Sequence, residues 1–357
     1  MSNVTVMGID IAKNVIQIHG ADRRGKRLLK KRLSRDAFLP FMANLPKCLV
    51  GMEACGGAHH WAKELTKLGF EVKLMSPQKV KKYADHNKND ARDAEACAEA
   101  VTRANMRFIS VKTDVQLGLQ AVHRVRSYYV KQRTGLMNMM RGLLLESGIA
   151  VPKGKSHLEK NLTVLLDEES QNLRPDEKIL FKRLKEDLAK IESEVIYHTS
   201  KIEKLAKEDD ACQRLQTIDG VGPLSATAIV AKIGNGSEFQ KGRDLSVYLG
   251  LTPRQHSSGE KQILLGITKH GDRYIRQLLI HGGRACVKSA LRVNKKTGEF
   301  YKNDSHSVWA RSLVDRVGIN KASVALANKN ARMMVALLKN KTTFCAELAH
   351  YQENRSL

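Results

Sequence analysis

The chain has 357 residues, which is too long for one average domain and fits roughly two or three. It carries 61 lysines and arginines against 37 aspartates and glutamates, so the formal net charge is +24. Such an excess is hard to explain for an enzyme of small molecules and is natural for a protein that binds a polyanion. The polyanion we expect is nucleic acid.

An anionic membrane is the other polyanion, and the sequence favours it less. No apolar stretch approaches the roughly 20 residues of a spanning helix, and the first residues lack the pattern of a signal peptide. The 6 cysteines are scattered without a C-x-x-C pair, which is typical of reduced thiols and argues against a disulfide set or a zinc site. We therefore expect a cytoplasmic protein without a membrane partner.

Short strand patterns open the chain. Residues 4–10, 15–20 and part of 23–35 read as three neighbouring strands, and strand patterns return at 48–53 and 70–75. Helical patterns lie between the later strands, at 36–44 and 58–68. This order predicts an α/β domain and resembles an RNase H-like fold, an assignment that rests on resemblance as well as on periodicity.

Four acidic residues stand where such a domain could bring them together. Asp10 and Glu53 each close a short apolar run that reads as a buried strand. Asp90 and Asp93 open an Ala-rich helical stretch and, three residues apart, share one helix face. Carboxylate oxygens are the ligands that Mg²⁺ prefers, so the four could hold this metal. A metal beside a phosphodiester favours phosphoryl transfer.

Basic residues surround these acids in the sequence. Residues 23–35 are dense in lysine and arginine, which fits a solvated edge strand or a surface that contacts phosphate. Lysines near the aspartate pair could balance charge or hold a phosphate. Because the whole chain is basic, we favour phosphate contact. The candidate nucleic-acid contacts in this part are Arg24, Lys26, Lys30, Lys81 and Lys88.

Helical patterns dominate the middle and the end of the chain. Two long ones cover roughly 113–146 and 175–208, and the second has apolar residues at heptad-like spacings. This face fits an intramolecular helical hairpin and a coiled-coil dimer seam equally well. Residues 217–234 form a Gly-x-Gly turn before an Ala-rich helix. That pattern resembles a helix-hairpin-helix, whose turn can bind DNA phosphate. The alternative is a tight turn that only packs one helix against another.

A serine pair occurs in a polar segment that we predict to be a loop. Ser257 and Ser258 precede Gly259. A serine hydroxyl attacks only when its surroundings help to remove its proton, and this tripeptide alone is common in loops. Candidate nucleic-acid contacts flank it or follow it toward a basic amphipathic helix: Arg254, Lys261, Lys269 and Arg273. A further amphipathic helix is predicted over 318–338.

Several motifs together carry a resemblance over nearly the whole chain. They are Gly-Ile-Asp10-Ile-Ala-Lys, Met-Glu53-Ala-Cys-Gly, Lys-Asn-Asp90-Ala-Arg-Asp93-Ala, Ile-Asp-Gly-Val-Gly-Pro, Leu-Gly-Leu-Thr-Pro-Arg with Ser-Ser-Gly after it, Ile-Thr-Lys-x-Gly-Asp, and Asn-Lys-x-Ser-Val-Ala-Leu-Ala-Asn-Lys-Asn-Ala-Arg. In this order and spacing they resemble the DEDD transposases of the IS-one-hundred-ten insertion-sequence family, closest to its IS-eleven-eleven branch.

The resemblance implies a division of the chain into domains. Residues 1–111 would form a RuvC-like DEDD domain and 112–208 a helical coiled-coil region. A mainly helical C-terminal transposase domain with a catalytic serine would cover 209–346, and 347–357 would be a flexible tail. The protein would be bacterial, cytoplasmic and associated with the nucleoid.

The resemblance also implies an RNA-guided recombinase. Family members cut and rejoin double-stranded DNA, donor and target, under direction of a structured non-coding guide RNA called bridge or seeker RNA. The cut would leave a serine joined to the 5′-phosphate, best matched by Ser258 although Ser257 is adjacent. The four acids would hold Mg²⁺, for which Mn²⁺ could substitute. A homo-oligomer, dimer or tetramer, is expected.

Two other functions stay open from the sequence. A structure-selective nuclease of the RNase H superfamily, such as a Holliday-junction resolvase, would use the same acids with water as the nucleophile. A non-catalytic RNA- or DNA-binding protein would need no acid cluster. The four acids argue against this function, because clustered carboxylates repel one another and DNA.

Overall fold

The computed structural model describes residues 3–83, 90–258 and 261–344, without the side chains of Asp90 and Ala91. The chain divides into two compact units, Met1–Thr113 and Asp114–Leu357, which we describe separately. Lys88 and the expected tail at 347–357 lie outside the described residues.

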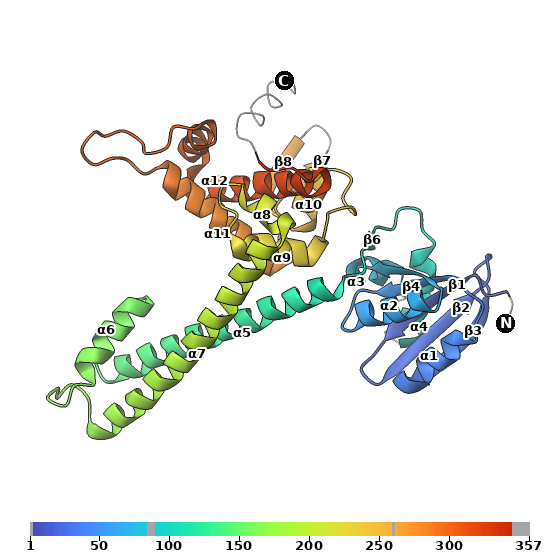
Figure 1. The fold of residues 1–357 in the computed structure, drawn as a ribbon, viewed down its shortest axis with the longest axis horizontal. Helices are drawn as coiled ribbons and strands as arrows, with labels where there is room; N and C mark the ends of the chain where they lie inside the picture. Colours follow the sequence, from blue (N-terminus) through green and yellow to red (C-terminus); the bar gives the residue numbers. More distant parts are fainter. Residues whose placement is uncertain (1–2, 84–89, 259–260, 345–357) are drawn as a thin grey trace. The chain divides into compact units, whose positions relative to one another are not determined.

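A six-stranded sheet forms the centre of the first unit, in the order β3-β2-β1-β4-β5-β6 (Figure 1). The strands are β1 (Val6–Ile11), β2 (Val15–Ala21), β3 (Arg27–Ser34), β4 (Leu49–Glu53), β5 (Glu71–Met75) and β6 (Phe108–Ile109). The three early strands are antiparallel neighbours, as the sequence predicts, and β4 and β5 continue the sheet parallel to β1. The expectation of a mixed α/β domain is confirmed.

The two faces of this sheet are covered differently. Helices α1 (Arg35–Ala43) and α2 (Ala58–Lys67) pack their apolar side chains on the face that carries Ile9 and Met52, and these residues form the main core of the unit. Helix α4 (Asp90–Val101) covers the opposite face with small residues. Short α3 (Pro77–Val80) and η1 (Lys81–Tyr83) lie between β5 and α4 in the chain.

Two glycines let α4 lie unusually close to the sheet. A Cβ built on Gly8 of β1 would stand 1.9 Å from the Ala94 carbonyl oxygen and 2.3 Å from the Ala98 nitrogen. A Cβ on Gly51 of β4 would stand 2.6 Å from the Cys97 carbonyl oxygen. No side chain fits in either position, so glycine at both is what allows the helix backbone to touch the strands.

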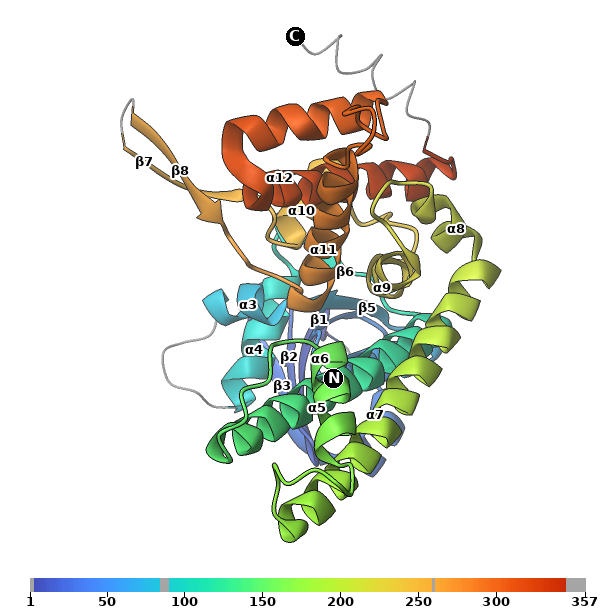
Figure 2. The same cartoon turned by 90° about the vertical axis from the view of Figure 1, so that its left-hand side faces the viewer.

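A helical arm extends from the second unit (Figures 1 and 2). It consists of α5 (Asp114–Glu146), α6 (Lys155–Leu165) and α7 (Pro175–Glu208), which confirms the two long helices predicted from the sequence. The buried residues of α7 recur every seven positions, at Phe181, Leu188, Val195 and Ile202, and α7 packs on α5 of the same chain. The heptad face therefore forms an intramolecular hairpin.

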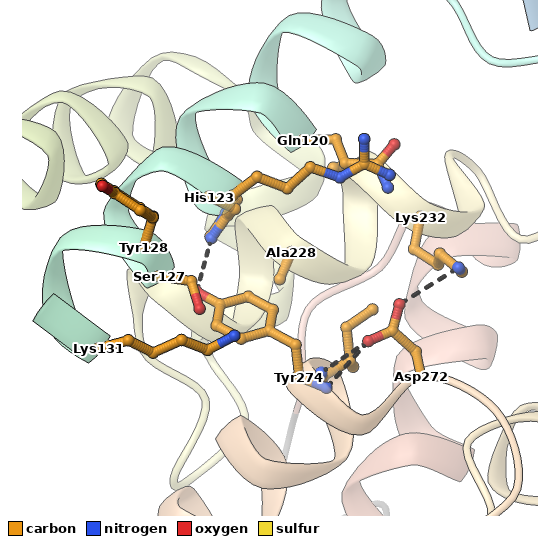
Figure 3. Close-up of a pocket in the computed structure, with 12 residues that line it drawn as sticks. Gln120, His123, Ser127, Tyr128, Lys131, Ala228, Lys232, Asp272 and Tyr274 are labelled. Atoms are coloured by element: carbon orange, nitrogen blue, oxygen red, sulfur yellow. Dashed lines mark hydrogen bonds and ion pairs between the residues drawn. The ribbon is translucent and has the colours of Figure 1, made fainter. Parts of the chain in front are cut away.

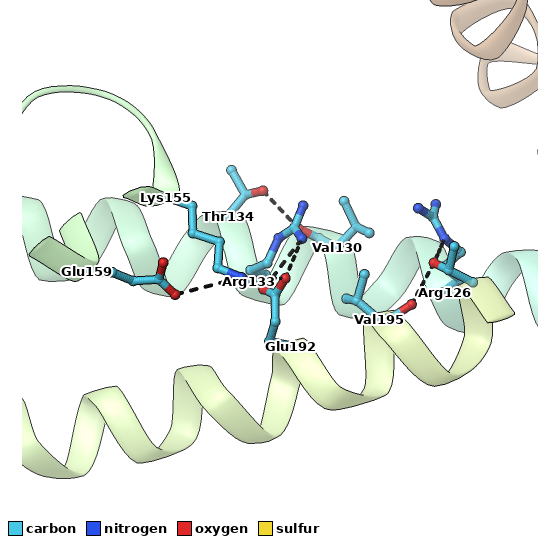
Figure 4. Close-up of polar contacts among 9 residues, drawn as sticks. Arg126, Val130, Arg133, Thr134, Lys155, Glu159, Glu192 and Val195 are labelled. Carbon is cyan, nitrogen blue, oxygen red and sulfur yellow. Dashed lines mark hydrogen bonds and ion pairs between the residues drawn. The ribbon is translucent and has the colours of Figure 1, made fainter. Parts of the chain in front are cut away.

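Polar contacts fasten the arm across its helices (Figure 4). Glu192 of α7 accepts from the Arg133 guanidinium of α5 at 3.3 Å, and Lys155 at the start of α6 lies 2.9 Å from the same carboxylate. Nearer the other end of the arm, Arg126 donates to the Thr199 hydroxyl at 2.7 Å. The half-buried Glu192 therefore joins all three helices of the arm.

Five further helices form the body of the second unit. They are α8 (Asp210–Gln216), α9 (Pro223–Ile233), α10 (Gly242–Tyr248), α11 (Arg273–Ala290) and α12 (Ser305–Asn340). Their largest apolar cluster centres on α9, which is buried on nearly every side. The helix predicted at 318–338 is the second part of α12, which breaks at Gly318, where φ is 79°. A positive φ suits glycine and bends the helix there.

The Gly-x-Gly turn before α9 has a packing role. Gly220 has a φ of +81°, and a Cβ built on it would stand 2.7 Å from the Gly282 carbonyl oxygen of α11. Gly222 has open space around it and caps α9. The close approach of Gly220 and Gly282 accounts for the first glycine without a nucleic-acid contact.

His123 joins the arm to the helical body (Figure 3). The Thr227 hydroxyl donates to the Pro223 carbonyl at 2.6 Å, so it accepts from Nε2–H of His123 at 2.9 Å. Nδ1 of His123 then accepts from the Tyr274 hydroxyl at 2.9 Å. The histidine is 4% exposed, and burial lowers its pKa to about 4, with Arg126 adding to the shift.

None of the helices in the described ranges is both long and apolar enough to cross a membrane.

We expect Gly8→Ala to destabilise the first unit, because the added methyl group would press on the backbone of α4. The free energy of unfolding should fall by about 2 kcal/mol or more. Gly56→Ala is the matched control, since a Cβ there meets nothing within 4 Å, and it should change this energy by less than about 0.5 kcal/mol. Urea unfolding followed by Trp61 fluorescence in a Trp309→Phe background measures both. Equal stability of the two variants would contradict the packing.

We expect His123 to make stability fall in acid. Its pKa drops from 6.5 to about 4 on folding, so below pH 6.5 the unfolded chain takes a proton that the folded chain does not. Stability therefore decreases from pH 6.5 down to pH 4, by about 3 kcal/mol in total from this group. His123→Gln should lose this part of the pH dependence, and His157→Gln, at an exposed site on α6, should keep it. Denaturant unfolding at both pH values compares the three proteins.

Candidate active site

Two of the predicted acids lie side by side at one edge of the first sheet. Strands β1 and β4 run parallel, and their last paired residues are Ile9 and Met52. Asp10 and Glu53 come next in each strand and are both half-buried. Because side chains alternate along a strand, Asp10 shares a face with Gly8 and Glu53 with Gly51. Both carboxylates are therefore on the face that α4 covers.

The third acid arrives on α4 itself. Asp93 immediately precedes Ala94, whose carbonyl oxygen lies against Gly8. The pKa of Glu53 is raised, first by burial and then by the charges of Asp10 and Asp93. Asp10 and Asp93 therefore both lie close enough to Glu53 to influence its charge. Asp90 is the first residue of α4, and its side chain lies outside the described part of the structure.

Two cysteines near these acids have a raised pKa, and the negative charge of the acids contributes to both shifts. Cys97, one turn after Asp93, has a raised pKa, first from burial and then from Glu53 and Asp10. Burial also raises the pKa of Cys55, and Asp10 and Glu53 add to it. Both thiols stay protonated near neutral pH, so neither is a nucleophile.

These carboxylates fit a hard divalent cation. Every donor that the three residues offer is a carboxylate oxygen, and no soft sulfur or imidazole ligand was predicted with them. Asp10 and Asp93 raise the pKa of the half-buried Glu53, and a bound cation would relieve this unfavourable energy. The sequence found these residues, whereas it missed that Gly8 and Gly51 open the space for α4. A glycine inside each strand was the available signal.

The turn after Asp10 is held by a residue that the sequence analysis did not single out. Arg35, the first residue of α1, donates to the carbonyl oxygens of Ala12 at 3.4 Å and Lys13 at 3.2 Å. Its guanidinium lies 5.0 Å from the centre of the Trp61 ring. We therefore regard Arg35 as a positioning residue for the end of β1.

The predicted basic residues of the first unit lie at its surface. Arg24 and Lys26 are exposed in the turn between β2 and β3, and Lys30 is exposed on β3. Asp10 pairs with Gln17 across β1 and β2, and Gln17 pairs with Arg32 on β3. Directly opposite residues share a face, so Arg32, which was not among the candidates, lies on the same sheet face as Asp10.

A second group of basic residues follows β5. Lys81 is exposed on η1. The pKa of Lys79 is lowered, first by burial and then by Arg107 and Lys82, which shows that positive charge is crowded here. Because Met75 at the end of β5 pairs with Glu53, this group begins at the carboxyl ends of the strands that carry the acids.

The serine pair lies in a hairpin, so the predicted loop is wrong. Ser257 and Ser258 end β7 (Pro253–Ser258), which pairs antiparallel with β8 (Lys261–Ile267) and projects from the helices of its unit (Figure 2). Pairing gives both segments backbone hydrogen bonds that a loop would leave to water. Every residue of β7, including Arg254, is exposed, and so is Lys261 at the start of β8.

The two serines differ in their contacts. The Ser257 hydroxyl accepts from the Gln255 side-chain amide at 2.8 Å. Among the described residues, the Ser258 hydroxyl has no hydrogen-bond partner, and Ser258 stands directly opposite Lys261. Successive strand residues point to opposite faces, so only Ser258 shares a face with the Lys261 ammonium group.

The residues that follow the hairpin divide between surface and interior. Lys269 and Arg273 are exposed, in line with the prediction of a basic surface. Arg276, three residues after Arg273 on α11, is 8% exposed. Its guanidinium donates to the carbonyl oxygens of Leu249 and His270, both at 3.0 Å. Arg276 therefore fixes the loop before α11 instead of meeting a ligand.

A second acidic cluster occurs in the body of the second unit. Asp219, Asp304 and His306 bring ligand-type atoms within 4.8 Å of one another, the one such group among the described residues. Asp304 caps α12 and accepts from the Ser307 nitrogen and hydroxyl, while Asp219 lies 3.6 Å from His306 and 3.9 Å from Lys302. These protein partners account for the cluster without an ion.

We expect Mg²⁺ to stabilise the first unit through Glu53. In the wild-type chain, saturating Mg²⁺ should raise the unfolding midpoint by about 5 °C or more over EDTA, because only the folded state offers the joined carboxylates. Glu53→Gln should lose most of this shift, and Glu71→Gln, at an exposed site on β5, should keep it. Thermal scans with and without metal measure the shift. A thermal unfolding midpoint of the wild-type chain that does not change with Mg²⁺ would rule out a metal site at Glu53.

Two family models match separate parts of the chain. A transposase model for the DEDD type of IS110 elements matches residues 7–149, which include all four predicted acids. A model described as "Transposase IS116/IS110/IS902 family" matches residues 212–302, which include the serine hairpin. Each predicted half of the site thus falls within a region typical of this family.

Curated relatives match almost the whole chain. A transposase for insertion sequence element IS1111A of Coxiella burnetii is 41% identical over 96% of this chain and 92% of its own length. A probable family 20 transposase of Pseudomonas aeruginosa is 42% identical over 96% and 99%. A transposase for element IS1328 of Yersinia enterocolitica is 36% identical over 96% and 99%. The chain therefore belongs to the IS116/IS110/IS902 family of insertion-sequence transposases, fits its IS1111 branch, and is a DNA transposase.

Proposed function

We propose that this transposase cuts and rejoins double-stranded DNA through a serine nucleophile, guided by a structured non-coding RNA of its own element. The observation that carries the catalytic part is the convergence of Asp10, Glu53 and Asp93 at the ends of β1, β4 and the start of α4. Together with Asp90 they would hold Mg²⁺ or Mn²⁺.

The chemistry is a transesterification at phosphorus. The Ser258 oxygen forms a bond to the phosphorus while the bond from phosphorus to the 3′ oxygen breaks, so the proton lost by serine balances the one gained by the 3′ end. Bound Mg²⁺ would polarise the phosphate and stabilise charge on the leaving oxygen. The 5′-phosphoserine keeps the energy of the phosphodiester, so another 3′-hydroxyl can reverse the step without ATP.

Two features of the hairpin support Ser258 as the nucleophile. Its hydroxyl is exposed and has no partner among the described residues, whereas the Ser257 hydroxyl is bound by Gln255. Lys261 stands opposite Ser258, where its ammonium group would offset the charge of the attacked phosphate. The exposed residues Arg254, Lys269 and Arg273 would hold the DNA or RNA backbone nearby.

The domain plan follows from the same proposal. Residues 1–111 would be the RuvC-like domain with the acids, 112–208 the coiled-coil region and 209–346 the transposase domain with the serine. Several apolar side chains of the arm remain exposed, among them Leu145, Ile179 and Ile196. An arm that joins subunits would cover them and would let the serine of one subunit meet the acids of another in a dimer or tetramer.

The nucleophile can be tested with DNA that carries the ends of the element, in the presence of its flanking non-coding RNA. Wild-type protein should form an SDS-resistant adduct with the 5′ end of the cut strand. Ser258→Ala should lower cleavage by roughly 10³-fold or more and abolish the adduct. Ser257→Ala, the matched neighbour, should keep both. Cleavage that survives Ser258→Ala would favour water as the nucleophile, as in a resolvase.

The acids can be separated from binding in the same assay. Asp10→Asn should lower cleavage by roughly 10³-fold or more because it removes a metal ligand, while DNA affinity should stay within about threefold. Omitting the RNA should abolish cleavage at the element ends if the RNA chooses the site. Normal cleavage by Asp10→Asn would instead point to a protein that does not use this acidic site.

A further inference from the structure

A cavity of about 400 Å³ opens where the arm meets the helical body of the second unit (Figure 3). Its volume lies within the roughly 300–1,000 Å³ typical of ligand sites. One side is a stripe of α5 that includes Arg124, Tyr128 and Lys131, at helical spacing. The other side comes from α9 and the start of α11. The cavity uses none of the residues assigned to cleavage.

Positive charge is in excess around this cavity. Arg124, Lys131 and Lys232 line it against a single carboxylate, that of Asp272. Asp272 accepts from the backbone nitrogens of Tyr274 and Ile275 and lies 3.2 Å from Lys232, so its charge is already engaged. Among the described residues, Arg124 and Lys131 form no ion pair. Two unneutralised cations thus face one opening.

The floor of the cavity is rigid, and its rim carries an aromatic ring. Tyr274 donates its hydroxyl proton to His123, which Thr227 holds from the other side, so the Tyr274 ring is fixed in place. In Figure 3 the Lys131 side chain extends toward this ring. Tyr128 is 56% exposed at the rim. The Tyr128 ring packs edge-to-face with Tyr129, with centroids 5.4 Å apart, and its exposed part lies on the same helix stripe as Arg124 and Lys131. An exposed aromatic ring near cations is typical of sites that stack a nucleobase.

We infer that this cavity binds one unpaired nucleotide of the nucleic acid that the transposase handles. Arg124 and Lys131 would contact its phosphate, and Tyr128 would stack on its base. A paired and stacked base does not present its face to a side chain, so the ligand is a single-stranded or unpaired segment. The inference rests on the proposed function only in taking nucleic acid as the ligand.

Binding can be measured without cleavage. The full chain carrying Ser258→Ala is titrated in EDTA with fluorescent oligo(dT), oligo(U) and a duplex of equal length, at several salt concentrations. Arg124→Ala with Lys131→Ala should weaken single-strand binding about 10-fold or more and reduce the slope of log affinity against log salt by about 1.4. Tyr128→Ala should weaken it about 5-fold or more. All three positions are exposed, so the fold should tolerate these changes.

Matched controls separate this site from general basicity. Lys201→Ala, at an exposed position on α7 outside the cavity, should change affinity by less than about twofold. The oligonucleotide with the larger loss, dT or U, identifies the source of the nucleotide as DNA or RNA. Oligonucleotides with 5-iodouracil should crosslink to the peptide that contains Tyr128.

Two results would overturn the inference while leaving the proposed function intact. One is wild-type single-strand affinity in the double variant and in Tyr128→Ala. The other is an equal loss on the duplex, which has no unpaired base to insert. If the wild-type chain bound no oligonucleotide at all, the proposed function would fail together with this site.

Discussion

The contact between α4 and the two strand glycines controls the geometry of the first unit. Gly8 and Gly51 leave no room for a side chain, so the helix backbone rests directly on β1 and β4. Asp93 lies at the sheet edge because Ala94, the next residue, touches Gly8. A helix held one side-chain layer further away would carry its carboxylate out of reach of Asp10 and Glu53.

This packing creates an electrostatic cost. Three half-buried carboxylates meet here, and burial together with the charges of Asp10 and Asp93 raises the pKa of Glu53. Protein folds retain such arrangements where function uses them, since burial and like charge both disfavour the ionised form. Basic residues such as Arg32 and Lys81 stand at the surrounding surface instead, where they can meet a polyanion. The unit therefore keeps a cluster of carboxylates apart from a basic surface.

The sequence predicts the strands and the acids well because both follow simple patterns. The apolar runs that end in Asp10 and Glu53 predict buried strands, so each acid is expected at the end of a strand. It predicts the hairpin of Ser258 poorly, since exposed polar residues carry no apolar alternation. It misses the cavity beside His123, because residues about 100 positions apart line it and only the folded chain brings them together. The heptad pattern of α7 was ambiguous because an apolar helix face does not show whether it packs on a helix of the same chain or of another subunit.

The central claim is that the carboxylates at the ends of β1 and β4 hold a divalent cation. Anomalous diffraction from crystals of the wild-type chain grown with Mn²⁺ tests it most directly. The account predicts an anomalous peak at about 2 Å from carboxylate oxygens of Asp10, Glu53 and Asp93. A map with no peak at these residues, or with its peak at Asp219, Asp304 and His306 alone, would contradict it.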